Sequence, residues 1–395
     1  MVAARAALPA TLTAWAGPST VSTVNPASTS SPASGSTPVG RPRPAVESLP
    51  AYRPGKAASQ AEAEHGISDA IKLASNENAL PPVDAVLAAI TSAIGGVNRY
   101  ADHRCTELRA RISEWLGVPG DAVTVGCGSV GLLQQLLLTY VDPGDEVVYP
   151  WRSFEVYPVF TQLVEGQAVT TALVDHAFDL DAVHAAITER TKLVLLASPN
   201  NPTGSALTVE EIDAFLSKVD HRTIVVVDEA YREFVDPRFG DPTELVAKHA
   251  HLAVLRTFSK AHGLAALRVG YGVANPEVVA SIDKTLFPFA VNGLAQVAAI
   301  AAIDAIDEIR ERVDVIVAER KRMAAELAAA GWKVPPSEAN FLWLPLGERT
   351  DEIYVALEKS GVVTRPFSGE GIRVTISTAD ENDRFLAALT AAATA

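Results

Sequence analysis

The sequence predicts an α/β fold in which a mostly parallel sheet is covered by helices and joined to a smaller α+β part. Short apolar segments, each about the length of a buried strand, alternate with segments whose apolar residues recur at helical spacing. This alternation is typical of a parallel sheet with helices on both faces. The 395 residues suffice for two domains, and 48% of them are hydrophobic against 20% charged, so most of the chain can bury a core.

The expected strands are short segments dominated by apolar residues. In chain order they span residues 122–125, 146–149, 193–197, 223–227 and 252–255, with two strands of the smaller part at 341–344 and 371–376. Helices are expected through Leu108 and Ile112 and over residues 132–138. A further helix begins after Thr208, because Glu211 completes a capping box.

A long alanine-rich segment follows the last strand of the sheet. It predicts one helix over about residues 294–330, which ends before Gly331. Its apolar residues recur at helical spacing and predict one packed face, formed by Ile306, Ile309, Val313, Ile316 and Met323.

The first 45 residues differ from the rest of the chain. Ser, Thr, Pro, Ala and Gly dominate there, and large apolar side chains are scarce, so we expect a disordered tail over 1–45. A targeting peptide and a start assigned too far upstream are the alternatives. The remaining chain is expected to form an N-terminal arm with the start of the small domain (46–94), a large domain (95–290), and an interdomain helix with the small C-terminal domain (291–395).

Charge and cysteine content limit the expected partners and location. The 47 acidic and 33 basic side chains give a formal charge of −14, which disfavours nucleic acid and anionic membranes as partners. The longest apolar run, 297–303, is too short for a membrane helix. Cys105 and Cys127 cannot form a disulfide framework, so we expect a cytoplasmic protein, and no metal site is expected.

Lys260 is the first candidate for chemistry. It follows a predicted buried strand, where partial desolvation lowers the pKa of an amine toward that of a usable nucleophile. Ser259 supplies a hydroxyl beside it, and Arg268, eight residues further on, supplies a guanidinium suited to a phosphate. An amine, a hydroxyl and a guanidinium together suit an aldehyde cofactor that carries a phosphate.

Asp228 is the second candidate, because it ends a predicted buried strand. Open parallel sheets bind their ligands at the carboxyl ends of strands. A carboxylate there can keep a pyridine nitrogen protonated, and Tyr231 can donate a hydrogen bond to a phenolate oxygen on the same ring. Asp228 could also cap a helix. The segment 198–204, which contains Asn201, is equally typical of a turn after another strand.

The glycines of the segment 126–131 match the spacing G-x-G-x-x-G after a strand and before a helix. This spacing occurs in dinucleotide-binding folds and gives one alternative, a nucleotide-dependent oxidoreductase that uses NAD. The acid that should end the next strand is missing, because that strand leads into Trp151 and Arg152. The amides of Ser129 and Val130 at the helix start suit a phosphate of another ligand equally well.

These motifs, in this order, resemble those of the fold-type I aminotransferases that use pyridoxal phosphate. The match covers about residue 49 to the end and is closest to the branch of histidinol-phosphate and aromatic amino acid aminotransferases. The motifs are Leu73-Ala74-Ser75-Asn76-Glu77-Asn78, Asn98-Arg99-Tyr100, 198–204, 228–231, 259–268, Asn340-Phe341 and Arg373-Val374-Thr375. The resemblance implies a large domain with a seven-stranded type of sheet that binds the cofactor, and a smaller α+β domain.

The resemblance also implies a role for each matched residue. Lys260 binds the cofactor's aldehyde and moves the proton of the substrate, Asp228 pairs with the ring nitrogen, and Tyr231 and Asn201 bond the ring oxygen. The phosphate contacts are the amides of Ser129 and Val130, Ser259 and Arg268, and Phe154 stacks on the ring. The neighbouring subunit of a homodimer donates Tyr100, and the substrate is bound by Asn78, Asn340 and Arg373, the last on its carboxylate.

The segments 126–130, 151–157 and 287–291 are more similar to the actinobacterial aromatic amino acid aminotransferases. They favour transfer of an amino group from a phenylalanine-like donor to a 2-oxo acid. The alternatives within the same fold are a histidinol-phosphate aminotransferase of histidine biosynthesis and a decarboxylase of an amino-acid phosphate. A chain that has lost catalysis and retains the fold for regulation is a further alternative.

Overall fold

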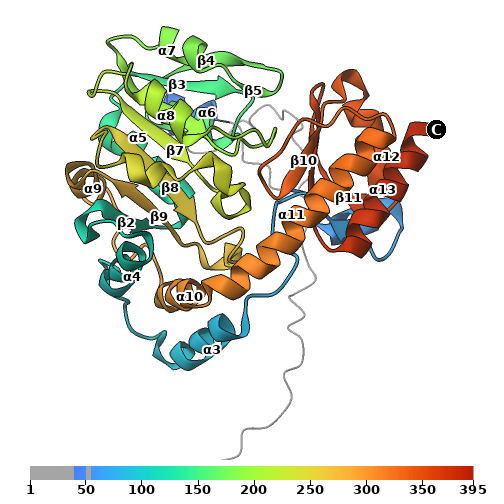
Figure 1. Ribbon diagram of the computed structural model, residues 1–395, viewed down its shortest axis with the longest axis horizontal. Coiled ribbons are helices and arrows are strands. Elements are labelled where there is room, and N and C mark those ends of the chain that lie inside the picture. The colour runs from blue at the N-terminus through green and yellow to red at the C-terminus, as the bar shows by residue number, and fades with distance from the viewer. Residues whose placement is uncertain (1–39, 50–54, 395) are drawn as a thin grey trace, which may run out of the picture. The chain divides into compact units, whose positions relative to one another are not determined.

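The centre of the fold is an eight-stranded sheet with strand order β2-β9-β8-β7-β6-β3-β4-β5 (Figure 1). Its strands are β2 (Val123–Gly126), β3 (Glu146–Trp151), β4 (Gln167–Val174), β5 (Ala177–Phe178), β6 (Thr191–Ala197), β7 (Ile224–Asp228), β8 (Leu252–Thr257) and β9 (Gly270–Ala274). The neighbours from β4 through β3, β6 and β7 to β8 are parallel, whereas β9 is antiparallel to β8 and β2. The predicted α/β fold with a mostly parallel sheet is confirmed, and β5 is a two-residue addition to seven longer strands.

The computed structural model describes residues 40–49 and 55–394. The described residues from Pro44 onward form one unit by their contacts. Residues 1–39 of the predicted tail over 1–45 lie outside the described residues. The helix α1 (Pro44–Glu47) includes the last two positions of that predicted tail. The domain boundaries proposed from the sequence stay a prediction.

Helices cover both faces of the large sheet, and α2, α12 and α13 pack against one another and β11 in the C-terminal part. After α1, the helices of the described chain are α2 (Ala58–His65), α3 (Asp84–Ala93), α4 (Thr106–Leu116), α5 (Gly128–Tyr140), α6 (Val156–Leu163), α7 (Leu180–Ala185), α8 (Val209–Leu216), α9 (Pro276–Ile282), α10 (Gly293–Asp304), α11 (Ile306–Ala329), α12 (Thr350–Lys359) and α13 (Ala379–Thr394). The predicted capping box at the start of α8 is present, with Thr208 and Glu211 bonding each other's backbone amides. In the part of the chain that is described, no helix is long and apolar enough to span a membrane.

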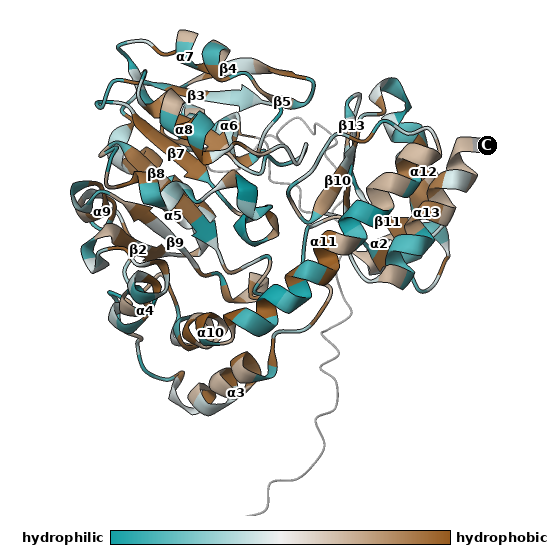
Figure 2. Ribbon diagram, viewed as in Figure 1, coloured by the Kyte–Doolittle hydropathy of each residue, from teal (hydrophilic) through white to brown (hydrophobic). Residues whose placement is uncertain are grey.

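Alternate residues of the central strands pack into different hydrophobic clusters. Leu193 and Leu195 of β6 join the cluster that contains α5, α6 and α9, whereas Val194 and Leu196 join the cluster that contains α4, α8 and α10. Strands buried on both faces are hydrophobic over most of their length, and Figure 2 shows β7 and β8 as mainly hydrophobic. This double burial explains why these strands read as continuous apolar runs in the sequence.

Three strands of the sheet, β4, β5 and β9, were not predicted, and β5 has only two residues. β9 contains Gly270 and Gly272, which weaken a strand signal, although every residue of the strand is buried. A Cβ at Gly270 would lie 2.5 Å from the backbone nitrogen of Ser129, so the glycine allows β9 to pass close to the start of α5. β4 was missed because all its residues are exposed or half-buried, so it lacks the continuous apolar run that marks the buried strands.

The predicted single helix over 294–330 is wrong, because the segment forms two helices. Ala305 lies between α10 and α11 with φ −100° and ψ 24°, outside helical geometry. The two helices have different partners: α10 packs on α3 and α4, and α11 packs on β10, α13 and the 3₁₀ turn η3 (Arg232–Phe234). One straight helix over the whole segment could not contact both groups of partners. The predicted packed face of α11 is buried at Ile309, Val313, Ile316 and Met323, whereas Ile306 is half-buried.

Smaller sheets join the N-terminal arm to the C-terminal part. β10 (Phe341–Leu344), β13 (Gly371–Thr375) and β12 (Arg365–Phe367) form an antiparallel sheet, and β1 (Ile71–Lys72) pairs with β11 (Val362–Val363). The amide of Thr375 donates to the carbonyl of Leu73 at 2.9 Å, and the amide of Asn76 donates to Oγ1 of Thr375 at 2.9 Å. The segment after β1 is therefore fixed beside the end of β13.

A buried ion cluster connects the carboxyl ends of β7 and β8. Arg256, on β8, is 3% exposed and donates through Nε and Nη2 to Oε2 of Glu229, which directly follows β7, at 2.8 and 2.6 Å. Asp241 contacts the same guanidinium. Buried charges are stable only when paired, so this cluster holds the two strand ends in a fixed relation.

Replacing Arg256 tests this connection. Arg256→Met leaves the buried carboxylate of Glu229 without its main counter-charge, and we expect the free energy of unfolding to fall by about 3 kcal/mol. Urea denaturation followed by circular dichroism measures the change. Arg238→Met is the matched control, because Arg238 pairs with Asp236 at the surface and its loss should leave stability unchanged. Equal effects of the two substitutions would contradict a structural role for the cluster.

Candidate active site

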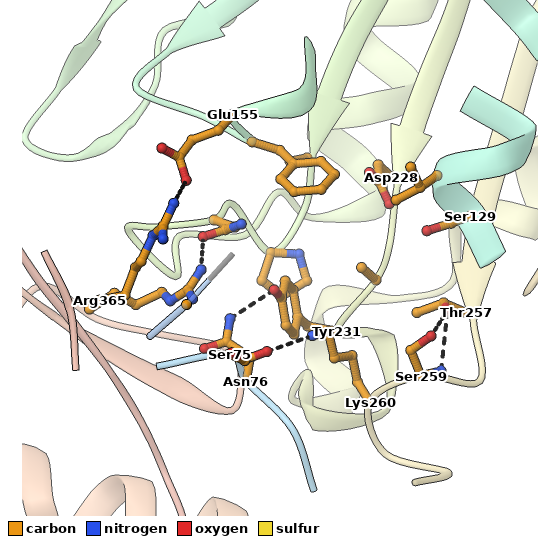
Figure 3. A pocket seen from close by; sticks show the side chains of 18 of the residues that line it. Ser75, Asn76, Ser129, Glu155, Asp228, Tyr231, Thr257, Ser259, Lys260 and Arg365 are labelled. Carbon is orange, nitrogen blue, oxygen red and sulfur yellow. Dashed lines mark hydrogen bonds and ion pairs between the residues drawn. The ribbon is translucent and has the colours of Figure 1, made fainter. Parts of the chain in front are cut away.

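A cavity of about 250 Å³ lies at the carboxyl ends of the central parallel strands (Figure 3). Ala197, Asp228 and Thr257, the last residues of β6, β7 and β8, all line it. Its other lining residues are Gly55, Ala74, Ser75, Asn76, Ser129, Val130, Phe154, Glu155, Pro199, Asn201, Ala230, Tyr231, Ser259, Lys260, Arg268, Arg365 and Arg373. The location is the one at which open α/β sheets bind ligands.

Asp228 presents an unsatisfied carboxylate oxygen in this cavity. Its Oδ2 accepts a hydrogen bond from the hydroxyl of Tyr157 at 3.2 Å, while Oδ1 is buried and has no partner among the described residues. Burial raises the pKa of Asp228 to about 6, because an ionised carboxylate is poorly solvated there. An N–H donor or a cation placed against Oδ1 would restore the ionised form.

Lys260 enters the cavity from the loop after β8. Its Nζ donates to the backbone carbonyl of Ser75 at 3.0 Å and lies 5.8 Å from the ring centre of Tyr231. Burial, and then the positive charge of Arg373, lower the pKa of Lys260 to about 7. A large part of the amine is therefore unprotonated at neutral pH and can act as a nucleophile or a base.

Tyr231 is held by residues that come from both ends of the chain. Its hydroxyl accepts a hydrogen bond from Nδ2 of Asn76 at 2.9 Å, and Oδ1 of Asn76 accepts one from the hydroxyl of Thr375 at 3.0 Å. The ring packs edge-on against Phe341 with centroids 5.0 Å apart. These contacts fix the position of the phenol at the cavity.

One end of the cavity has the features of a phosphate site. Ser129 and Val130 lie in the first turn of the 13-residue helix α5, whose N-cap, Cys127, makes no side-chain capping bond in the described structure. Nη1 of Arg268 donates to Oγ of Ser259 at 3.2 Å. Free amides at a helix start, a hydroxyl and a guanidinium together form a strong site for an anion.

The glycines at this end have packing roles. Gly128 has φ +73°, and a Cβ there would lie 2.8 Å from Nη2 of Arg268, so the glycine lets the guanidinium approach the helix start. A Cβ at Gly126 would lie 2.7 Å from Cγ of Leu132. Both contacts account for the G-x-G spacing without a dinucleotide, and the next strand, β3, ends at Trp151 without an acid for a ribose.

Two arginines of the C-terminal sheet lie on another side of the cavity. Arg373, on β13, donates to the side-chain oxygen of Asn201 and to the carbonyl of Ala74, the latter at 2.6 Å. Nη2 of Arg365, on β12, donates to Oε2 of Glu155 at 2.7 Å. In Figure 3, Arg365 and Glu155 lie on the opposite side of the cavity from Ser129 and Ser259.

Three residues predicted for the site do not line the cavity. Tyr100 is 85% exposed and stacks on Phe289 with ring centroids 4.5 Å apart. Asn78 supports the lysine loop, since its Nδ2 donates to the carbonyl of Ala261 at 3.0 Å. Asn340 is buried and donates to the carbonyl of Asn76 at 3.2 Å, so it lies one contact away from the cavity.

Several lining residues were missing from the sequence prediction. Ser75 and Asn76 belong to a motif that had been recognised, but only Asn78 was chosen from it, because their partners Lys260 and Tyr231 are known only from the fold. Thr257 ends a predicted strand, and its position was a usable signal. Nothing in the sequence around Glu155 or Arg365 indicates a place in the cavity, since each is typical of a charged residue at the surface.

The donor set fits a flat, phosphorylated aldehyde with a ring nitrogen. Lys260 supplies the amine for the aldehyde, and Oδ1 of Asp228 is a buried acceptor that lacks a donor. The start of α5 with Ser259 and Arg268 would hold the phosphate. Asn201 and Tyr231 present polar groups in the same cavity.

Comparisons with known proteins agree with this chemistry. The family described as aminotransferase class I and II matches residues 68–389. The chain is 48% identical over 345 residues to an aromatic amino acid aminotransferase of Thermobifida fusca (87% of this chain, 95% of the relative). It is 47% identical over 346 residues to one of Streptomyces avermitilis, with the same coverage.

The fold agrees with a solved structure of a related enzyme. Histidinol-phosphate aminotransferase from Sinorhizobium meliloti, solved in complex with pyridoxal 5'-phosphate, superposes with a TM-score of 0.83. The two are 30% identical, and the match covers 90% of this chain and 98% of the other. The predicted enzyme class, an aminotransferase that uses pyridoxal phosphate, is confirmed, and the dinucleotide alternative is not supported. The cavity at the carboxyl edge of this sheet fits a phosphorylated aldehyde, and the family match covers most of the chain. The chain therefore belongs to the class I and II aminotransferases.

Proposed function

We propose that the chain transfers the amino group of an aromatic amino acid, such as phenylalanine, to a 2-oxo acid. The observation that carries the proposal is the convergence of Lys260 and Asp228 on one cavity that also has a phosphate end. Relatives at 47–48% identity over most of the chain are aromatic amino acid aminotransferases, which supports the choice of donor. The histidinol-phosphate enzyme, at 30% identity, is the second candidate.

Different residues of the cavity have different roles in this reaction. Pyridoxal phosphate, when bound, supplies an electron sink for the electron pair left on the substrate's Cα. Oδ1 of Asp228 would accept a hydrogen bond from the protonated ring nitrogen, and Tyr231 and Asn201 would hold the ring oxygen. Arg268, Ser259 and the amides of Ser129 and Val130 anchor the phosphate end.

Lys260 performs the proton transfer in this proposal. Its unprotonated Nζ would remove the proton from the substrate's Cα and return a proton later in the reaction. A pKa near 7 suits a group that must take up and return a proton at neutral pH. Phe154 would pack against one face of the ring, and Arg373 would bind the α-carboxylate. Asn78 and Asn340 would act on the substrate only indirectly, since Asn78 bonds the carbonyl of Ala261 and Asn340 bonds that of Asn76.

The proposal includes a homodimer in which Tyr100 completes the partner's site. Tyr100 is 85% exposed in the single chain and does not line its cavity. Nearby in the sequence, Ile94 and Val97 are 57% and 64% exposed, and Phe287, close to the stacking partner Phe289, is 75% exposed. Several exposed apolar residues in two neighbouring segments are characteristic of a surface that another chain covers. A cytoplasmic location also remains part of the proposal, with Cys105 and Cys127 as free thiols.

The donor amino acid is tested by single half-reactions of the holoenzyme. Phenylalanine should convert the bound cofactor to its amine form at least about tenfold faster than histidinol phosphate at equal concentration. Stopped-flow absorbance measures both rates without any choice of acceptor. Lys260→Ala is the control, because it removes the amine and should abolish both the visible absorption and the reaction. A faster reaction with histidinol phosphate would make the second candidate correct.

The lowered pKa of Lys260 predicts how cofactor uptake depends on pH. Bond formation with the aldehyde requires the unprotonated amine, so the uptake rate of the cofactor-free protein should rise with pH and level off above a midpoint near 7. Absorbance at a series of pH values measures this midpoint. Arg373→Met removes a positive charge that lowers the pKa, so the midpoint should move upward. A wild-type midpoint close to 10 would show that the lysine is solvated.

Mixing an impaired variant with an inactive one tests the role of Tyr100. Tyr100→Ala should lose about tenfold or more in rate, as expected for a lost bond to a charged group, and Lys260→Ala should be inactive. If Tyr100 acts on the neighbouring site, a dimer with one chain of each kind has one intact site, and random pairing restores about a quarter of wild-type activity. Steady-state assays after mixing and refolding measure this recovery. Recovery that stays at the level of Tyr100→Ala alone would show that the tyrosine does not act across chains.

A further inference from the structure

A buried histidine–carboxylate pair joins two segments that carry groups of the site. Nε2 of His262 lies 3.1 Å from Oε1 of Glu233. His262 is two residues after Lys260, and Glu233 is two residues after Tyr231. The side chain of His262 is fully buried and that of Glu233 is 12% exposed, and neither residue lines the cavity. The pair can therefore act on the site only through the two segments that it joins.

The hydrogen bond of this pair has a defined direction. Burial raises the pKa of the Glu233 carboxyl, but the bond from His262, with smaller help from Arg256 on β8, outweighs burial and brings that pKa below its usual value. An ionised carboxylate only accepts hydrogen bonds, so Nε2 of His262 carries a proton and donates it. Nδ1 of His262 has no partner among the described residues, so the bond to Glu233 is the polar anchor of the ring.

Aromatic rings enclose the histidine side of the pair. The ring centroid of His262 lies 4.8 Å from that of Phe258 and 6.2 Å from that of Trp115, which it meets edge-on. Tyr271, on β9, packs against both of these rings. In a region closed to water, a carboxylate without its donor is strongly disfavoured, so the pair holds the two segments at one separation.

We propose that His262 and Glu233 are positioning residues, which hold the amine of Lys260 at a fixed place relative to Asp228 and Tyr231. This inference rests on the role proposed for Lys260. Its Nζ lies 5.8 Å from the ring centre of Tyr231, and both side chains reach the same cavity (Figure 3). A lysine side chain is long and flexible, so the amine meets the aldehyde efficiently only if the backbone beneath it is fixed.

The lysine segment has further attachments that do not involve this pair. Nδ2 of Asn78 donates to the carbonyl of Ala261, and Nζ of Lys260 donates to that of Ser75, both at 3.0 Å. Both partners belong to the segment that follows β1. Loss of the pair should therefore leave the lysine segment folded but able to shift relative to Tyr231, and water should then reach the amine.

A second histidine–carboxylate pair provides a matched control. Nε2 of His249 lies 2.6 Å from Oδ1 of Asp213, and His249 is 8% exposed. This pair joins α8 to the residues before β8, whereas the cavity lies at the opposite end of that strand. His249→Phe therefore removes a similar contact without touching the lysine segment.

The experiment follows the uptake of pyridoxal phosphate by cofactor-free protein, measured by absorbance at a series of pH values. In His262→Phe the maximal uptake rate should fall about tenfold, because the amine is no longer held in place. The midpoint of the pH dependence should rise from near 7 toward the value of a solvated amine, because water favours the protonated form. His262→Gln can still donate to Glu233 and should stay within about threefold of wild type. His249→Phe should leave both the rate and the midpoint unchanged.

A double variant separates positioning from stability. His262→Phe leaves the carboxylate of Glu233 unpaired and should lower stability to urea, whereas adding Glu233→Met removes that buried charge and should restore it. The double variant can thus be measured even if the single one does not fold. Its uptake should remain slow and its midpoint high, because the link between the segments is still missing.

Three results would overturn the proposal. They are recovery of uptake together with stability in the double variant, wild-type uptake in a folded His262→Phe, and an equal loss of uptake in His249→Phe. A Lys260→Ala protein that still develops the visible absorption would instead overturn the role proposed for Lys260.

Discussion

The site depends on two charged groups that the fold removes from water at the ends of adjacent strands. Burial raises the pKa of Asp228 to about 6 and lowers that of Lys260 to about 7, so each group is pushed toward its neutral form. The sheet imposes this burial, because Asp228 is the last residue of β7 and Lys260 follows β8, next to it in the parallel sheet. A ligand that offers an N–H to the carboxylate and an aldehyde to the amine relieves both groups at once.

The same burial makes the protein without cofactor sensitive to pH. Asp228 binds a proton more tightly in the folded state, so its contribution to stability is lost as pH rises from about 4 through 6. Lys260 binds a proton less tightly when folded, so its contribution is lost as pH falls from about 10 toward 7. Near neutral pH both groups oppose folding. Cofactor binding therefore stabilises the fold by more than its own contacts, as expected when a site is prepared for a ligand that binds only the folded state.

Much of the site followed from local sequence because its key residues adjoin strands. Asp228 and Lys260 could be placed at one edge of the sheet as soon as their strands were recognised, since the carboxyl ends of parallel strands meet there. The ion pair between Glu155 and Arg365 joins residues 210 positions apart, and nothing near either of them indicates the other. The break in the helix at Ala305 was not predicted for a related reason. The alanine-rich sequence favours a helix on both sides of Ala305, and only the packing partners of α10 and α11 require a change of direction.

Cofactor chemistry and substrate choice lie on different parts of this fold. The groups expected to hold the cofactor belong to the strand ends and helix start of the large sheet, whereas Arg365 and Arg373 belong to the C-terminal sheet and Glu155 to the segment that faces it. Asn76 connects the two parts, because it bonds both Tyr231 and Thr375. A change in the substrate side can therefore leave the buried pair of Asp228 and Lys260 as it is. Relatives with one cofactor site and different substrates are what this separation would produce.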